Sequence, residues 1–589
     1  MPNKFLNTQD SAAPQRLRDN VGKIKVSESQ NLFEADFEYS AQPMRWENFT
    51  AGAATITQIS NQGGVQLSVT GASGDLAIRQ TRPYIRYQPG KTIYMATGHV
   101  FGPPITNNRQ RVGFFDDANG MFLEVGDPTA TNPTGLAVVY RSDTGTSGVQ
   151  EYRTLANAWS DPNQIAASLN WQIMQMVWME YAWYGAGMLR WGVTIQGEPY
   201  TLHQIGIANL PGQINAWSRT GNLPVRYENR NVGTTTANSF YHWGVSVLAE
   251  GKIDSQRGFT YGYGTAPTRA PSAATRYPLL SIRYRNMGTL EYGVDTAYSG
   301  ANGTLPTGGA AITGVSQTAT QTVVTCSSAT WTPSQWVDKY FFSRGTTQAL
   351  TSITVSAAGS AAVVTNGTNY VSNGRYITIS GATGNTTVNG VFLVSGASAS
   401  GFTITGSGIT TGSVTGSPVM TSGQGPIGRI IANTATTLTV VDNIQSTSTA
   451  TLPMMIPPVA GSNYIIGLID RGQILPQILS IYSSANCTLE LITSTYSSPV
   501  QLTGASFATA YSLGSINSFA ERDISATALT GGEVVYNTPL PSGGLQTFDL
   551  SNFFPLFNVV QGNQPDILTV AITGTATVGA SLIAQEAMS

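Results

Sequence analysis

Charged side chains are scarce in this chain of 589 residues. They make up 11% of it, whereas an ordinary soluble protein has about a quarter. The stretch 301–460 has six of them, and its other residues are mostly Gly, Ser, Thr, Ala, Val, Ile and Asn. The six are Asp338, Lys339, Arg344, Arg375, Arg429 and Asp442. Such a composition is typical of all-β modules in durable assemblies and is rare in cytoplasmic metabolic enzymes.

Basic residues are no more abundant than acidic ones, and the net charge is −2. Nucleic-acid affinity depends on clustered Lys and Arg, so we expect no nucleic-acid partner. No run of about 18 apolar residues occurs, so we expect no membrane insertion. Residues 1–30 contain no apolar run, so we expect no secretory signal. These absences favour particles that are assembled in the cytoplasm and released by lysis.

Cysteine and histidine are also rare. Cys326 and Cys487 cannot make a disulfide framework, and buried free thiols are favoured over a single bridge. The three histidines, His99, His203 and His242, lie far apart and show no metal-binding spacing. Neither a nucleophile elbow nor a phosphate-binding glycine loop is found in the required context. We therefore predict no catalytic residues, no metal, no cofactor and no enzymatic activity.

Hydrophobic residues make up 41% of the chain, which is enough for large cores. Eight of the ten tryptophans lie between Trp46 and Trp243. Within this part, Leu189 to Ile195 alternates between apolar and other residues with the period of a strand. The preceding run, Met176 to Trp183, is apolar on both faces, as expected inside a sandwich, and a glycine-containing turn at 184–187 joins the two.

The chain as a whole is predicted to be all-β and multi-domain. Residues 31–275 are expected to form a Trp-rich, jelly-roll-like β-sandwich. A second sandwich is expected from 276–300 together with 461–589. The residues between them, 301–460, are then inserted charge-poor β modules, with a nested unit at about 347–421; such insertions are tolerated because loop closure costs grow slowly with length. Residues 1–30 are either a flexible terminus or an extended arm that orders across a neighbouring subunit.

One acidic group stands out, formed by Asp116, Asp117, Glu124 and Asp127. The favoured interpretation is turn formation, because Asp and Asn begin and close tight turns. A Ca²⁺ site is an alternative, since this ion takes six or more oxygen ligands. A pair of carboxylates that hydrolyses a glycan is a second alternative.

Aromatic residues cluster around the hairpin at 171–195. Trp183 and Tyr184 are expected at its end, where their rings can contact a glycan, because aromatic faces suit the C–H groups of a pyranose. Core packing or a subunit interface is the favoured role for the cluster as a whole. On a predicted strand nearby, Arg226, Glu228 and Arg230 alternate, which indicates a solvated face or salt bridges between subunits.

Several of these segments together resemble a module recurrent in virion proteins of tailed bacteriophages. The segments are 111–120, 138–142, the hairpin at 171–195 and 222–228. The segments 331–336, 423–440 and 377–405 resemble small β modules of phage structural and tail proteins. The resemblance covers about two thirds of the chain and brings no catalytic residues.

The resemblance implies a structural protein of the virion that forms a homo-oligomer, with a trimer favoured. Its place would be the tail, a tail fibre or the baseplate, with a role in host attachment through a surface glycan. Neighbouring virion proteins would be further partners, reached by residues 1–30. The alternatives are a capsid decoration or head-fibre protein and a glycan-degrading tail depolymerase.

Overall fold

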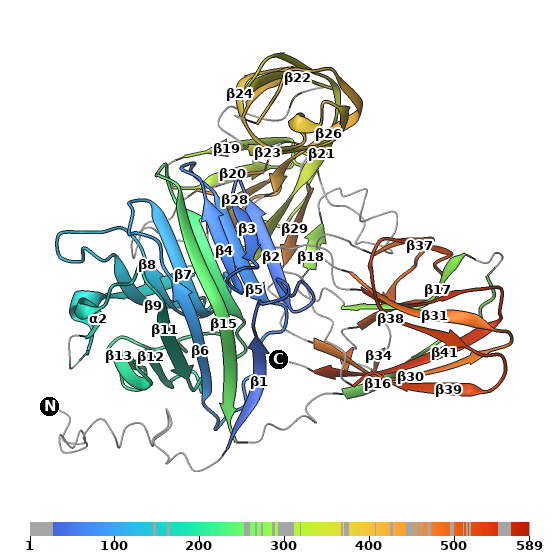
Figure 1. Ribbon diagram of the computed structural model, residues 1–589, viewed down its shortest axis with the longest axis horizontal. Helices are drawn as coiled ribbons and strands as arrows, with labels where there is room; N and C mark the ends of the chain where they lie inside the picture. The colour runs from blue at the N-terminus through green and yellow to red at the C-terminus, as the bar shows by residue number, and fades with distance from the viewer. Residues whose placement is uncertain are drawn as a thin grey trace. The chain divides into compact units, whose positions relative to one another are not determined.

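Antiparallel sheets make up nearly all the regular structure of the computed structural model (Figure 1), which confirms the predicted all-β, multi-domain class. Within the described residues, helix is confined to α2 (Ile165–Ser168) and the 3-10 turns η1 (Ala156–Ala158) and η2 (Thr386–Val388). The described residues are 28–144, 149–161, 165–251, 259–265, 268–271, 275–284, 289–292, 311–318, 320–366, 369, 376–406, 408–424, 428–442, 453–454, 457–458, 460, 463–467, 473–494, 500–509, 512–513, 516–517, 520–551 and 567–587.

Two compact units divide the chain. The first comprises described residues of 1–42, 55–71 and 77–256, and the second those of 43–54, 72–76 and 257–589. The predicted boundary at 275 differs from this division, because β16 (Phe259–Gly264) pairs with β41 (Val578–Ala587) and so belongs to the second unit. Of the predicted arm 1–30, residues 1–27 lie outside the described residues.

The first unit contains an eight-stranded antiparallel sheet with the order β13-β12-β11-β6-β15-β4-β3, and β1 also pairs with β15. The predicted hairpin at 171–195 corresponds to β11 and β12, with Trp178 opposite Gly192. The strands are β1 (Ser29–Ala35), β3 (Thr55–Ile59), β4 (Gly64–Val69), β6 (Ile93–Val100), β11 (Gln175–Tyr181), β12 (Met188–Ile195), β13 (Glu198–Gly206) and β15 (Asn238–Glu250).

Six strands of a second sheet lie in the same unit, in the order β10-β9-β8-β7-β14-β5. They are β5 (Leu76–Thr81), β7 (Asn108–Phe115), β8 (Gly120–Val125), β9 (Leu136–Ser142), β10 (Gln150–Leu155) and β14 (Val225–Asn231). Contacts between the sheets form the sandwich: the Trp191 indole donates to the Phe122 carbonyl at 3.2 Å. The rings of Tyr181 and Phe114 also meet edge to face at 5.2 Å.

The second unit contains a twelve-stranded sheet formed largely by residues of the predicted insertion. Its strands are β18 (Thr289–Tyr292), β19 (Gly314–Gln317), β20 (Thr322–Thr325), β21 (Tyr340–Ala357), β22 (Ser360–Thr365), β23 (Tyr376–Gly384), β24 (Gly390–Ser398), β25 (Gly401–Thr405), β26 (Val414–Gln424), β27 (Gly428–Asn433), β28 (Thr437–Asp442) and β29 (Asn463–Gly467). The pairing of β18 with β29 extends this sheet beyond the predicted limits 301 and 460.

Two separate cores lie along this sheet. One gathers Trp331, Trp336 and Phe341 with residues of β27 and β28. The other gathers fourteen buried residues from Leu350 to Met420, within the range of about 347–421 where a nested unit was expected. Each core belongs to its own β module.

The remaining described strands of the second unit are β2, a four-stranded sheet with the order β16-β41-β30-β39, a six-stranded sheet with the order β33-β36-β17-β40-β31-β38, and the pairs β32-β37 and β34-β35. The pairing of β17 with β40 brings 276–284 beside 567–573. The strands not yet given are β2 (Trp46–Ala51), β17 (Arg276–Tyr284), β30 (Gln473–Ser483), β31 (Cys487–Thr493), β32 (Gln501–Thr503), β33 (Ala508–Thr509), β34 (Ser512–Leu513), β35 (Ile516–Asn517), β36 (Ala520–Asp523), β37 (Ala528–Thr530), β38 (Glu533–Leu540), β39 (Leu545–Asp549) and β40 (Ile567–Thr573).

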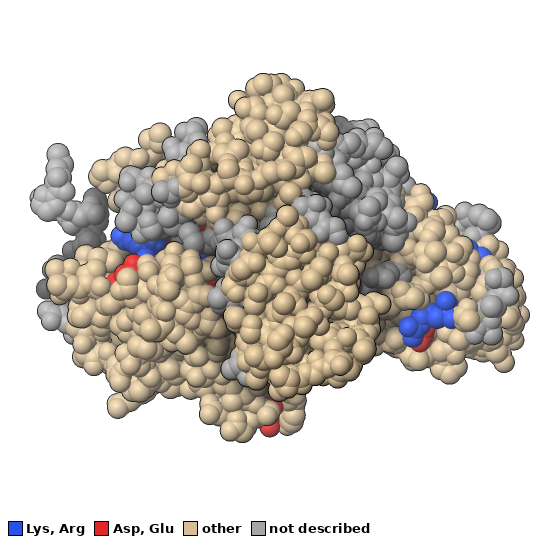
Figure 2. Space-filling model, turned by 90° about the horizontal axis from the view of Figure 1, so that it is seen from above, with Lys and Arg blue, Asp and Glu red and all other residues tan. Residues whose placement is uncertain are grey.

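Few charged side chains of the described residues are visible on the face shown in Figure 2. Figure 2 shows one face on which Lys, Arg, Asp and Glu form only small spots among other residues. Cys326 is buried and Cys487 partly buried, and neither is in a disulfide. None of the helices in the described residues has the length and apolar character of a membrane span.

Candidate functional site

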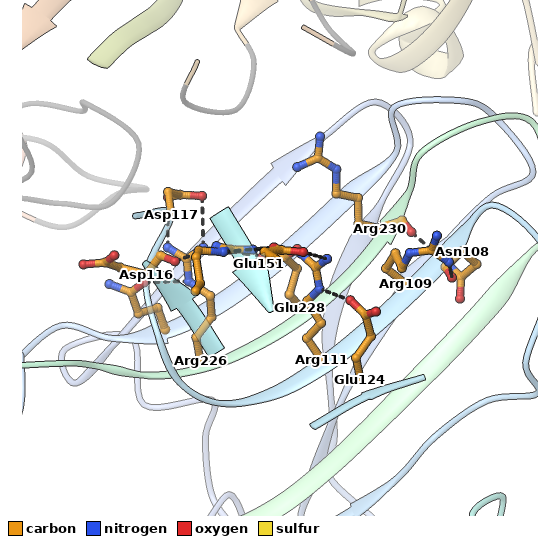
Figure 3. A network of polar contacts seen from close by, with 12 residues as sticks. Asn108, Arg109, Arg111, Asp116, Asp117, Glu124, Glu151, Arg226, Glu228 and Arg230 are labelled. Atoms are coloured by element: carbon orange, nitrogen blue, oxygen red, sulfur yellow. Dashed lines mark hydrogen bonds and ion pairs between the residues drawn. The ribbon is translucent and has the colours of Figure 1, made fainter. Parts of the chain in front are cut away.

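One face of the sheet that contains β7, β8, β9, β10 and β14 carries an unusual concentration of charge. Alternation along these strands turns the charged residues to the same side, because side chains two positions apart share a face. We call this set the charged face (Figure 3). It consists of Arg109, Arg111, Asp117, Glu124, Arg141, Glu151, Arg153, Arg226, Glu228 and Arg230.

Arg111 lies at the centre of the charged face, and strand register brings its partners to it. On β8 its opposite residue is Glu124, and on β14 it is Glu228. The Nε atom of Arg111 lies 2.6 Å from Glu124 Oε2, and its Nη1 atom lies 3.0 Å from Glu228 Oε1. Its Nη2 atom is 3.6 Å from Glu151 Oε2. One buried guanidinium therefore neutralises parts of three buried carboxylates.

Glu151 is the second residue of the charged face around which several partners gather. It accepts from Arg141 at 2.7 Å and from Arg153, whose Nε also lies 2.9 Å from Glu124. Arg153 thus links Glu151 to Glu124, and Arg141, Glu151, Arg153 and Glu124 form one connected ion-pair network.

Arg226 extends the network toward the β7–β8 turn. Its two terminal nitrogens donate to the two carboxylate oxygens of Asp117 at 3.1 and 3.0 Å. Nη1 also lies 3.4 Å from Glu228. Such bidentate pairs are strong and fix the geometry of both partners.

Two phenylalanines form an aromatic floor beneath the network. Phe115 and Phe122 have ring centroids 4.6 Å apart. The guanidinium carbon of Arg111 lies 5.0 Å from the Phe122 centroid, and that of Arg226 lies 5.3 Å from Phe115. Arg141 lies over both rings. These contacts add cation–π attraction to the ion pairs.

The arginines hold the carboxylates of the network in their charged form. Burial alone would raise the pKa of Glu151, but Arg153, Arg111 and Arg141 outweigh it and lower the pKa to about 2. Burial opposes ionisation of Glu124 as well, yet Arg153 and Arg111 hold its pKa well below the ordinary value. A general acid for glycoside cleavage needs a raised pKa, and Glu124 and Glu151 have the opposite shift.

The four acidic residues singled out in the sequence occupy different positions. Asp116 Oδ1 accepts from the backbone N–H groups of Ala118 and Asn119 at 2.8 Å each, as turn chemistry predicts. Asp117 and Glu124 have arginine partners in the network, as described above. Asp127 pairs with Arg109 at 2.7 Å. In the described part of the chain, no group of three or more His, Cys, Asp and Glu residues can hold a metal ion.

The sequence-based interpretation of Arg226, Glu228 and Arg230 needs correction. A solvated face or inter-subunit bridges were expected, but all three side chains are buried, and Arg226 and Glu228 pair within the chain. A signal was present in the sequence, because Arg109 and Arg111 on β7, and Glu151 and Arg153 on β10, have the same two-residue spacing. Charges at this spacing on several strands of one sheet indicate a shared charged face.

Trp183 and Tyr184, the expected glycan contacts, lie in the β11–β12 connection and differ in exposure. The side chain of Tyr184 is 54% exposed. Trp183 is half-buried, and its indole N–H donates to the Ser218 carbonyl at 2.8 Å. Tyr184 is therefore the accessible ring of the two.

No protein-family model matches the chain, and no curated protein matches it in sequence. Solved structures similar to it include a glycosyl hydrolase family 16 protein of Mycobacterium smegmatis, with 10% identity, a TM-score of 0.25, and coverage of 37% of this chain and 100% of the other. The carbohydrate recognition domain of Emp47p has 12% identity, a TM-score of 0.24, and coverage of 39% and 100%. A β-1,3-glucanase of Mycobacterium marinum has 9% identity, a TM-score of 0.26, and coverage of 37% and 98%.

The prediction of no enzymatic activity is corrected by these comparisons. The similar structures include glycosyl hydrolases, a glucuronan lyase and a transglycosylase. At such low identity and TM-score the likeness assigns no activity, substrate or catalytic residue to this chain.

Proposed function

We propose that the chain is a structural component of a tailed-phage virion, a homo-oligomeric protein of the tail, fibre or baseplate type that contacts the host surface. Its modules would be assembled in the host cytoplasm and carried on the particle. A protein with this role needs β modules connected firmly enough to transmit force, and it needs resistance to unfolding after release.

The observation that carries the proposal is the strand β21, which belongs to two modules at once. Its first residues pair with β29 and β27, as Tyr340 does with Gly467 and Arg429. Its later residues pair with β26 and β22, as Ala349 does with Val419. Backbone hydrogen bonds of one strand therefore connect the module with the core around Trp331 and Phe341 to the inserted module with the core from Leu350 to Met420. A flexible linker would lack such hydrogen bonds. Continuity of this kind suits a module displayed on a particle.

The charged face supports the same proposal. Removing one member of a buried ion-pair network leaves an unpaired buried charge, so separating the strands that carry the network is costly. If the network forms only after the transition state of folding, it must be broken before the chain can unfold. The cost of breaking it then slows unfolding and gives kinetic stability. Structural proteins of particles depend on such stability.

The proposal is tested by immunogold electron microscopy of particles in a lysate of the producing host, with antibodies raised against the purified chain. We expect gold on the particles, at the tail or its appendages. Label on the capsid would replace the tail assignment with the capsid-decoration alternative. Unlabelled particles in a lysate that contains the soluble chain would overturn the virion role.

A further inference from the structure

Four connections of the first unit are bonded to one another beside the β11–β12 hairpin. The backbone N–H of Trp217 donates to the Gly185 carbonyl at 3.0 Å. The Thr144 hydroxyl donates to the Ala216 carbonyl at 2.8 Å, and the Arg219 N–H donates to Asn119 Oδ1 at 2.9 Å. The segment 216–219 thereby joins the β11–β12 connection, the β7–β8 turn and the residues that follow β9. We call this assembly the Tyr184 loop cluster.

Tyr184 has an unfavourable backbone conformation in this cluster. Its φ angle is +38°, a region that bulky residues rarely adopt and that stores strain. The connection nevertheless holds an aromatic side chain there, more than half exposed. The ring is supported from one side by Tyr87, with centroids 6.5 Å apart in an edge-to-face arrangement. Strain that keeps a supported ring at the surface indicates a role for that ring beyond packing.

Polar groups lie on the same segment. Arg219 Nε pairs with Asp143 at 2.7 Å; the Asp143 side chain is 2% exposed, whereas that of Arg219 is 47% exposed. Nη2 of Arg219 also donates to the Asp143 backbone carbonyl at 3.1 Å. Asp143 therefore fixes the guanidinium through two of its nitrogens and leaves Nη1 for another partner. Asn119 is 1% exposed, and its Nδ2 has no hydrogen-bond partner among the described residues. The cluster thus combines an oriented donor, an unused amide and an exposed ring.

We propose that the Tyr184 loop cluster binds a pyranose of a bacterial surface polysaccharide. The Tyr184 ring would lie against the apolar C–H face of the sugar, since aromatic faces and apolar surfaces associate. Nη1 of Arg219 would donate to a hydroxyl, with Asp143 and Trp183 as positioning residues. A neutral, compact ligand suits this cluster because Asp143 balances the charge of Arg219. The inference rests on the proposed contact with the host surface and names the ligand class.

The test uses the full-length chain on an array of immobilised O-antigen and capsular oligosaccharides. Tyr184→Gly removes the ring and supplies the residue best suited to a positive φ. Arg219→Ala removes the donor. Tyr39→Ala is the matched control, because Tyr39 is 87% exposed in the same unit and lies outside the cluster. We expect binding to at least one oligosaccharide, a loss of at least tenfold in each cluster variant, and unchanged binding in the control.

A stability measurement separates loss of the site from loss of the fold. Tyr184→Gly should have a Tm at or above that of the unmodified chain, because it relieves strain, while its saccharide binding falls. An array without any bound saccharide, or binding that survives both cluster substitutions, would overturn the proposal. If immunogold labels the particles but no oligosaccharide on the array binds, the saccharide site is ruled out and the virion role stands. If an oligosaccharide binds but immunogold does not label the particles, the saccharide site stands and the virion role is ruled out.

Discussion

Arg111 and Glu124 face each other across β7 and β8, with Nε 2.6 Å from Oε2 and both side chains buried. Desolvation of two charges is expensive, and their attraction compensates only when the geometry is good and further partners are present. Here Arg111 also reaches Glu228 and Glu151. The pair therefore depends on the network, and the network depends on Arg111.

Replacement of Arg111 by Met should be strongly destabilising. Met fills similar space but leaves Glu124, Glu228 and Glu151 short of a positive partner, and breaking a buried pair costs about 3–5 kcal/mol. The unfolding free energy from urea denaturation, followed by circular dichroism, measures this loss. Arg276→Met is the control, because the Arg276 side chain is 37% exposed in its pair with Glu490. Exposed pairs contribute about 1 kcal/mol or less, and equal losses in the two variants would contradict the role of the network.

Acid should weaken the first unit through Glu151. Its folded-state pKa is about 2, below the ordinary value of 4.5, so the unfolded chain binds this proton first as the pH falls. The stabilisation is fully present above about pH 4.5 and is lost progressively between there and pH 2, at up to about 1.4 kcal/mol per pH unit. Unfolding free energies measured between pH 5 and pH 3 should show this slope. Glu151→Gln should have a shallower slope, and an unchanged slope would contradict the prediction.

Burial of His99 should make the free energy of unfolding depend on pH in a second, less acidic range. It is fully buried, neither ring nitrogen has a hydrogen-bond partner among the described residues, and burial lowers its pKa to about 3. The unfolded chain protonates His99 near pH 6.5, so its contribution to stability is complete above that pH and falls as the pH drops toward 3. Between pH 6.5 and pH 5 the loss is about 2 kcal/mol.

The variant His99→Leu isolates this contribution, because His242 and the carboxylates remain. Its unfolding free energy, measured by urea denaturation at pH 7, 6 and 5, should decline less steeply than that of the unmodified chain. Identical declines would show that His99 is not held neutral in the folded sandwich.

The strand pattern was readable from the sequence where alternation is local, as in β11 and β12. The insertion at 301–460 was predicted from the change in composition along the chain. The charged face was not predicted, because its charges come from β7, β8, β9, β10 and β14, and only the tertiary register turns Arg111 toward Glu124 and Glu228. The pairing of β16 with β41 at the other end of the chain was not predicted either, because such long-range pairing has no local signal.

The nested module should be separable from its host. Thr347 and Thr421 face each other in the β21–β26 pairing, so a two-residue Asn-Gly turn can replace 348–420. The shortened chain should keep the core around Trp331 and Phe341. The isolated fragment 344–424 should fold around the core that runs from Leu350 to Met420. Thermal unfolding followed by circular dichroism tests both parts. An unfolded fragment together with an aggregated shortened chain would contradict the division into two modules.

The central claim is that this chain is a homo-oligomeric particle component. Its mass in solution, measured by light scattering coupled to size exclusion over a range of concentrations, tests that claim most directly. We predict a stable trimer of the 62.3 kDa chain that does not dissociate on dilution. A monomer at every concentration would contradict the claim.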